Sequence, residues 1–337
     1  MKCYICLTAP DEENSVYTDL LEATVVSARK NTSLEMIALY DGPHSHPCYQ
    51  IMIENGVNVI DHVFSHKKYL ETTYPKEFLL KSFGRVFSYD KLAGTFMRLD
   101  VPFIENKEEY VLYVDIDIMF MKDITFEDIP KPKYIAATAE IYKDINKMKN
   151  FNAGILVMNI KNMREKCSLI FEDLRHEKRN KVNIFDQGYL NQYCFHDMDI
   201  LPLEYNWKPY WGINHDAKII HYHGMKPGGN HSCSGFAMND DVIIETLNGH
   251  PKDIDGYLYY CLELFSCINK NGNEWTSKFI SKIFELFIMS APDSSRIGLE
   301  NHYSKKLKKI KNRYKKYLCI LLLIIISLIT GGLWYVI

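Results

Sequence analysis

Residues 110–120 read YVLYVDIDIMF, an apolar run that leads directly into two carboxylates separated by one residue. The β-branched and aromatic run from Tyr110 to Val114 predicts a buried strand. On an extended backbone residues i and i+2 point the same way, so Asp115 and Asp117 should face one side of the sheet edge. Two such carboxylates repel unless a divalent cation lies between them, and hard oxygen ligands suit Mn²⁺ or Mg²⁺. The motif is weak alone, because many solvated strand ends carry acidic pairs.

Strand and helix patterns alternate on both sides of this run, which predicts βαβ units and a mostly parallel sheet flanked by helices. The expected strands are residues 3–8, 36–40, 57–63, 110–114, 134–139 and 153–159, and the expected helices are residues 16–30, 163–179 and 186–193. Open sheets of this class bind ligands at the carboxyl ends of their strands, so residues 8–17 are expected to line a nucleotide site. That turn has neither a GxGxxG nor a Walker motif, so phosphates must be neutralised by other groups.

Composition places the chain among folded globular proteins. It has 337 residues, 47% hydrophobic and 24% charged, with a net charge of -2. This balance provides no overall basic field, so we expect no nucleic-acid partner. Cys3 and Cys6 form a CxxC pair without the second pair or histidines that a zinc site needs, so we interpret both as core residues.

The carboxyl-terminal region has a different composition. Residues 317–337 form an uncharged run of 21, about the length that a helix needs to cross ~30 Å of hydrocarbon. Residues 305–316 carry eight basic side chains, which favours the cytosolic side of a membrane. We therefore expect a single-pass tail anchor with residues 1 to about 300 in the cytosol, and no amino-terminal signal peptide. A buried terminal helix, or a nucleic-acid role for the basic run, is the less favoured interpretation.

A second run with ligand chemistry is KIIHYHGMKP at residues 218–227. Here a β-branched strand again ends in polar groups. His221 can serve as a neutral third metal ligand, and Lys226 can reach a phosphate as a point charge. His223 is interpreted as an ordinary strand-end residue.

In its motifs the chain resembles the glycogenin-like, retaining glycosyltransferases of family 8, which have a GT-A fold. The resemblance spans roughly residues 1–235 and lies in the order of its motifs: Thr8-Ala9-Pro10-Asp11 with Tyr17, Phe83-Gly84-Arg85 with residues 91–99, Tyr113–Asp117, Phe151–Asn159, Phe185–Asn191, and His221 with Lys226. The expected domains are a GT-A domain at 1–238, a helical extension at 239–304, the basic segment at 305–316 and the membrane helix at 317–337.

The resemblance implies a role for each matching residue. It implies a metal site of Asp115, Asp117 and His221, and catalytic roles for Asp186, Gln187 and Lys226. The donor-binding residues that it implies are Thr8, Ala9, Tyr17, Arg98, Asp115, Asn152, Ala153, Asp186, Gln187, Gly224 and Lys226. The chain departs from the family at the phosphate loop, where one residue instead of two separates Gly224 from Lys226, and Gly228 replaces a tryptophan. This departure concerns the phosphate contacts and leaves the three implied metal ligands unchanged.

The expected activity is transfer of a hexosyl residue from a UDP-sugar to a hydroxyl acceptor with retention, dependent on Mn²⁺ with Mg²⁺ as the alternative. Asp186 is either a nucleophile or a group that holds the sugar hydroxyls. The acceptor is open among glycan, protein and lipid, and the oligomeric state is open, with a dimer as one option. The alternatives are a metal-dependent nucleotidyltransferase or phosphohydrolase, and an inactive, membrane-tethered protein that binds sugar nucleotides.

Overall fold

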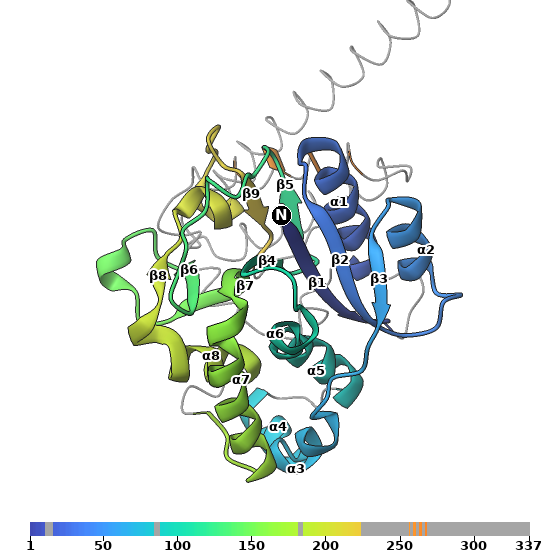
Figure 1. Cartoon of the computed structure of the whole chain (residues 1–337), viewed down its shortest axis with the longest axis vertical. Coiled ribbons are helices and arrows are strands. Elements are labelled where there is room, and N and C mark those ends of the chain that lie inside the picture. Colours follow the sequence, from blue (N-terminus) through green and yellow to red (C-terminus); the bar gives the residue numbers. More distant parts are fainter. Residues whose placement is uncertain are drawn as a thin grey trace, which may run out of the picture. The chain divides into compact units, whose positions relative to one another are not determined.

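The strand predicted at residues 110–114 is β4 (Tyr110–Val114), and it is the middle strand of a seven-stranded sheet ordered β3-β2-β1-β4-β7-β6-β8. The other strands of this sheet are β1 (Lys2–Thr8), β2 (Glu35–Asp41), β3 (Asn58–Asp61), β6 (Ile135–Ala139), β7 (Phe151–Asn159) and β8 (Asp199–Ile200). A separate antiparallel pair joins β5 (Ile118–Phe120) to β9 (Ile219–His221). Figure 1 shows this pair beside the amino-terminal half of the sheet.

This computed structural model describes residues 1–10, 16–83, 88–180 and 185–223, and six helical residues further on. Those six are Gly256, Tyr259, Tyr260, Glu263, Leu264 and Cys267. All described residues belong to one compact unit, Met1–Phe279. The predicted basic segment and membrane helix lie outside the described residues, as do the predicted domain boundaries. Within the described part of the chain, no helix combines the length and apolarity that a membrane crossing requires.

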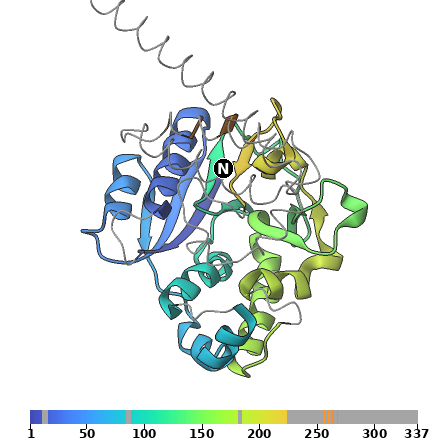
Figure 2. The ribbon, with the colours of Figure 1, turned by 180° about the vertical axis from the view of Figure 1, so that it is seen from behind.

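Helices cover both faces of the sheet. The α-helices are α1 (Val16–Asn31), α2 (Pro47–Glu54), α3 (Leu70–Thr73), α4 (Lys76–Phe83), α5 (Tyr89–Phe96), α6 (Val101–Ile104), α7 (Ile160–Arg175) and α8 (Phe185–Cys194). The 3-10 helices are η1 (Lys67–Tyr69), η2 (Met97–Asp100), η3 (Ile145–Lys147), η4 (Phe195–Asp197), η5 (Leu203–Asn206) and η6 (Pro209–Trp211). Figure 2 shows the same arrangement from behind.

The alternation of side chains along β1 divides the core in two. Ile5 and Leu7 pack with Leu21 and other residues of α1 and α2, whereas Tyr4 and Cys6 pack with residues of α5, α7 and α8 on the opposite face. Successive side chains of a strand point to opposite faces, so Cys3 and Cys6 belong to different core clusters and cannot share a metal ion. Both thiols are buried, as expected for core residues.

Strand direction decides which residues meet at the site. The β1–β2, β2–β3, β1–β4 and β6–β8 pairs are parallel, and β7 runs antiparallel to both β4 and β6. The carboxyl ends of β1, β4 and β6 therefore share one edge of the sheet with the amino end of β7. This is the expected mixed α/β fold with a mostly parallel sheet flanked by helices.

The other predicted elements agree with the structure to within two residues at each end, but one helix is shifted and one strand is shorter. The helix expected at residues 163–179 begins at Ile160, because the Asn159 side chain caps it by accepting from the Asn162 amide at 3.1 Å. It ends at Arg175, and Glu177 follows with a φ of 55°. The strand expected at 57–63 is limited to the four residues of β3, which pair with β2.

The six helical residues beyond 250 pack against the sheet domain. Gly256, Tyr260 and Leu264, spaced by four, are buried. The Tyr260 hydroxyl accepts from the Asn214 amide at 2.9 Å and donates to the Asn214 carbonyl at 3.0 Å. The Tyr222 hydroxyl, next to the end of β9, donates to the Tyr260 carbonyl at 2.7 Å.

Candidate active site

The acidic pair and the distant histidine meet at the sheet edge. One ligand atom each of Asp115, Asp117 and His221 lies within 4.8 Å of the others, and this is the metal-ligand cluster found among the described residues. His221 Nε2 is 3.4 Å from Asp117 Oδ1. Asp117 and His221 are buried, whereas the Asp115 side chain is 28% exposed. Two carboxylates and one imidazole form a ligand set that suits a divalent cation.

The paired strands β5 and β9 bring these ligands together. Ile118, just after the acidic pair, is opposite His221 in the antiparallel register. Thr24 of α1 holds this part of the chain by donating from its hydroxyl to the Ile116 and Ile118 carbonyls, both at 2.8 Å. A helix packed under the sheet thus fixes the backbone on both sides of Asp117.

Gly154 forms the floor of the ligand cluster. A Cβ at this position would lie 2.3 Å from His221 Cε1 and 2.9 Å from Asp115 Oδ2. Its carbonyl accepts from the Asp115 amide at 2.7 Å, which ties β7 to the first acidic residue. The ligands therefore close over a position where only glycine fits.

Arg98 is a buried cation that joins two of the predicted site carboxylates. Arg98 Nη2 is 3.0 Å from Asp115 Oδ1, and Arg98 Nε is 2.9 Å from Asp186 Oδ2. Arg98 Nη1 donates to the Ala153 carbonyl, and the guanidinium carbon lies 4.6 Å from the Tyr113 ring centre. Burial opposes the charged form, but Asp115 and Asp186 outweigh it and the pKa of Arg98 is raised. Arg98 thus positions other site groups, in addition to the donor contact expected of it.

Asp186 lies at the start of α8 and is 2% exposed. Burial raises the pKa of its carboxyl to about 6, although Arg98 works in the opposite direction. Near neutral pH the group is therefore largely ionised and paired with a guanidinium.

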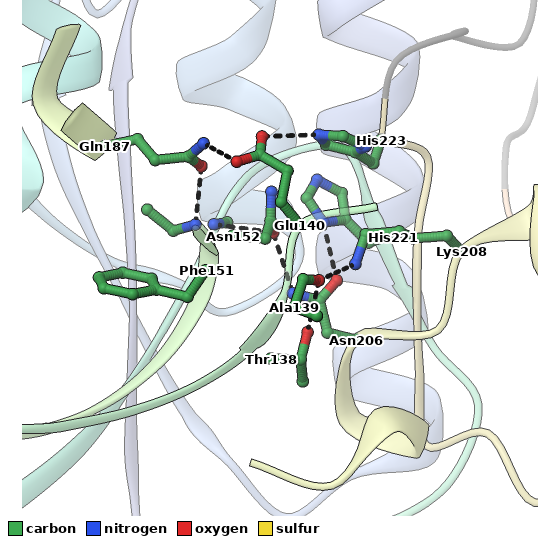
Figure 3. A network of polar contacts seen from close by, with 12 residues as sticks. Thr138, Ala139, Glu140, Phe151, Asn152, Gln187, Asn206, Lys208, His221 and His223 are labelled. Atoms are coloured by element: carbon green, nitrogen blue, oxygen red, sulfur yellow. Dashed lines mark hydrogen bonds and ion pairs between the residues drawn. The ribbon is translucent and has the colours of Figure 1, made fainter. Parts of the chain in front are cut away.

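Asn152, Ala153 and Gln187 meet at the amino end of β7. Gln187 Oε1 accepts from the Ala153 amide at 2.9 Å, and Gln187 Nε2 donates to Glu140 Oε2 at 2.6 Å. The Asn152 side chain accepts from the Gly154 amide at 3.1 Å. Both amide side chains predicted for the sugar site are therefore held in one orientation (Figure 3).

Glu140 is a site residue that the sequence interpretation missed. It follows β6 at the same sheet edge and is 3.5 Å from His223 Nε2 through Oε1. Burial lowers the pKa of His223 to about 4, against the raising effect of Glu140, so this imidazole is neutral near pH 7. The sequence did contain a signal for Glu140, because this carboxylate directly follows the strand predicted at residues 134–139, just as Asp115 directly follows the strand predicted at residues 110–114.

Lys208 and Asn206 were missed as well. Both side chains are completely buried beside β9. Lys208 Nζ donates to the Ala139 carbonyl at 3.0 Å and lies 4.2 Å from the Trp211 ring centre. Burial lowers the pKa of Lys208 to about 7, although Glu140 raises it. The Asn206 side chain is 3.0 Å from His221 Nδ1.

The residues predicted for the uridine edge lie at the end of β1 and the start of α1. Thr8 ends β1, and within the described part of the chain its buried hydroxyl has no hydrogen-bond partner. The Ala9 amide donates to the Asp41 carbonyl at 2.8 Å, and Tyr17 lies in the first turn of α1. Gly224 and Lys226, predicted for the phosphates, lie outside the described residues.

The chain is similar in sequence to one known family of proteins. The sequence model of glycosyl transferase family 8 matches residues 54–230. Three solved structures are similar in fold. The apo form of the bifunctional glycosyltransferase WbbM is 18% identical, with a TM-score of 0.48, covering 76% of this chain and 51% of that one. The chain thus spans about half the length of WbbM.

The second structure is mouse xyloside xylosyltransferase 1 in its apo form, 12% identical with a TM-score of 0.45, covering 67% of this chain and 98% of that one. The third is the galactosyltransferase LgtC in complex with donor and acceptor sugar analogues, 17% identical with a TM-score of 0.45, covering 74% and 96%. No curated protein sequence matches the chain.

Proposed function

Because the chain belongs to glycosyl transferase family 8, which confirms the prediction of a hexosyltransferase, we propose a specific reaction for it. It transfers a hexosyl residue from a UDP-sugar to a hydroxyl acceptor with retention at the anomeric carbon, and it uses Mn²⁺. The observation that carries the proposal is the convergence of Asp115, Asp117 and His221 beside the Asp186–Gln187 pair. A diphosphate site and a sugar site would then adjoin each other.

The cation site is supported by the chemistry of its ligands. Asp115 and Asp117 would supply carboxylate oxygens, and His221 would supply a neutral imidazole nitrogen. This ligand set suits Mn²⁺ better than it suits Mg²⁺, because Mg²⁺ prefers a shell made only of oxygen atoms. When bound, the cation would neutralise charge on the diphosphate as it leaves. Lys226 would add a positive charge to the same phosphates.

The sugar site determines the stereochemical route. Asp186 is buried and paired with Arg98, so its carboxylate is better suited to accept hydrogen bonds from sugar hydroxyls than to attack the anomeric carbon. Gln187, oriented by Ala153 and Glu140, would present its amide to the same sugar. In this route the bond from the anomeric carbon to the diphosphate breaks and the acceptor oxygen bonds that carbon from the same face. The acceptor proton passes to the departing diphosphate.

The deciding experiment follows products from a panel of UDP-hexoses incubated with the purified full chain and Mn²⁺. We expect one or more donors to release UDP in a Mn²⁺-dependent way, with a retained anomeric configuration in the product. Asp117→Ala should abolish turnover while the fold remains intact. Asp216→Ala is the matched control, because the Asp216 side chain is 92% exposed and pairs with Lys122, which is not among the predicted site residues. The proposal is wrong if the native, folded chain binds no UDP-sugar. Release of sugar phosphate instead of UDP would indicate a phosphohydrolase.

We also propose that residues 317–337 anchor the chain in a membrane, with the catalytic domain in the cytosol. The support is the uncharged length of that run and the basic residues before it. A membrane-associated acceptor, lipid or glycan or protein, would then be within reach.

A further inference from the structure

A chain of hydrogen bonds connects a backbone amide to the ring of the metal-site histidine. The Gly154 amide donates to Asn152 Oδ1 at 3.1 Å, and Asn206 Nδ2 donates to the same oxygen at 2.9 Å. Asn206 Oδ1 is in turn 3.0 Å from His221 Nδ1. Figure 3 shows Asn152, Asn206 and His221 in this order.

The backbone amide sets the orientation of every group in this chain. A backbone N–H can only donate, so the Asn152 atom facing Gly154 must be its carbonyl oxygen. That oxygen can only accept, so the Asn206 atom facing it must be the amide nitrogen. Asn206 therefore presents its oxygen to His221, and Nδ1 of His221 must carry the proton. In a neutral imidazole the Nε2 lone pair is then free on the side of Asp117, 3.4 Å away.

The position of Asn206 follows from the backbone. The Trp207 amide donates to the Ile219 carbonyl at 3.0 Å, and the His221 amide donates to the Trp207 carbonyl at 2.8 Å. The end of η5 thus runs alongside β9 and places a completely buried asparagine beside the ring. A buried amide with a mismatched partner is costly, so burial enforces the orientation.

We propose that Asn206 is a positioning residue, which holds His221 in the Nδ1–H tautomer so that its Nε2 lone pair is available to a divalent cation. Asn152 acts one step further out by orienting the Asn206 amide. The metal-binding part rests on the proposed function, whereas the tautomer is a property of the metal-free protein. Groups that orient a metal-ligating histidine in this way typically account for 10–100-fold in metal affinity.

The tautomer can be measured in the native full chain without any metal. Long-range proton–nitrogen correlation spectra of chain labelled in its 12 histidine rings distinguish Nδ1–H from Nε2–H imidazole. The His221 signal is identified as the one missing from His221→Gln. We expect a single Nδ1–H tautomer for His221. A predominant Nε2–H signal in the native protein would overturn the proposal, whatever the variants do.

Two variants at position 206 extend the test. Asn206→Leu keeps the volume and removes the acceptor, and we expect mixed tautomers and a Mn²⁺ dissociation constant raised by about 10–100-fold. Asn206→Asp retains an acceptor for Nδ1–H but places its second oxygen against Asn152 Oδ1, so it should retain the Nδ1–H tautomer while lowering the free energy of unfolding. Asn159→Ala is the control, because Asn159 is a buried asparagine on the same strand as Asn152 that caps α7 instead. It should lower stability and leave Mn²⁺ affinity unchanged.

The two readouts separate this proposal from the proposed function. If Asn206→Leu folds and keeps both the tautomer and the Mn²⁺ affinity of the native chain, Asn206 has no positioning role. If the native chain binds no Mn²⁺ at all, the proposed function fails, and the tautomer spectra still decide whether Asn206 orients His221.

Discussion

Replacing Gly154 with alanine should disable the metal site with little effect on the rest of the fold. The added Cβ would lie 2.3 Å from His221 Cε1, whereas two carbons pack at about 3.5 Å or more. The ring would therefore have to move by about 1.2 Å. His221 is 2% exposed and held by Asn206 at Nδ1, so it has no open direction in which to swing. The same Cβ would crowd Asp115 Oδ2 at 2.9 Å.

These distances give an expected size for each effect. Displacement of a site group by about 1 Å can cost about 100-fold in rate, and misplacement of a ligand about 10–100-fold in metal affinity. Overpacking of the buried strand should cost about 1–3 kcal/mol of unfolding free energy. Mn²⁺ titration by calorimetry, UDP release and urea unfolding measure the three effects separately.

Gly56→Ala is the matched control for this variant. Gly56 has a φ of 75°, and a Cβ there meets nothing within 4 Å. Alanine in that left-handed conformation should cost about 1–2 kcal/mol of stability without touching the site. If Gly154→Ala binds Mn²⁺ and releases UDP within twofold of the native chain, the ligand geometry inferred around Gly154 is wrong.

Three further predictions address charge and location. Lys208, with a pKa lowered to about 7, is neutral in the folded chain but protonated in the unfolded chain between pH 7 and 10.5, so stability should rise through that window. The rise is about 3 kcal/mol from pH 7 to 9, and urea unfolding of Lys208→Met should lack it. Glu105, whose pKa is lowered to about 2 as bonds from Lys2 and Tyr4 outweigh burial, stabilises the fold above pH 4.5 and less as pH falls toward 2. Glu105→Gln should therefore lower the midpoint of thermal unfolding at pH 7 and flatten its fall in acid; an unchanged acid profile contradicts this. Deletion of residues 317–337 should move the chain from the membrane pellet to the supernatant on fractionation, and a deleted chain that still sediments with membranes argues against the anchor.

The sequence was most informative where local patterns match the final structure. The apolar runs of β1 and β4 and the helix α1 could be placed within a residue or two, because each has a periodic apolar face and a clear end. Asp115 and Asp117 could be identified because they follow such a run directly. His221 could be proposed as a third ligand because it also ends an apolar, β-branched run, and the resemblance to family 8 implies the same role for it.

The missed residues depend on tertiary structure. Asn206 and Lys208 lie among short 3-10 helices with no periodic pattern, and only the pairing of Trp207 with β9 buries them. Glu140 becomes part of the site because β6 runs in the same direction as β4, which follows from two antiparallel pairings with β7. No local signal in the chain specifies these pairings.

The packing of Tyr260 against Asn214 and Tyr222 sets a practical lower limit on shortened versions of this protein. Tyr260 and Leu264 are completely buried, and Gly256 allows the helix backbone to approach the Pro209 carbonyl. A chain cut soon after His223 would expose this surface directly behind β9. Expression boundaries for crystallisation should therefore lie beyond residue 267, so that the strand carrying His221 keeps its support.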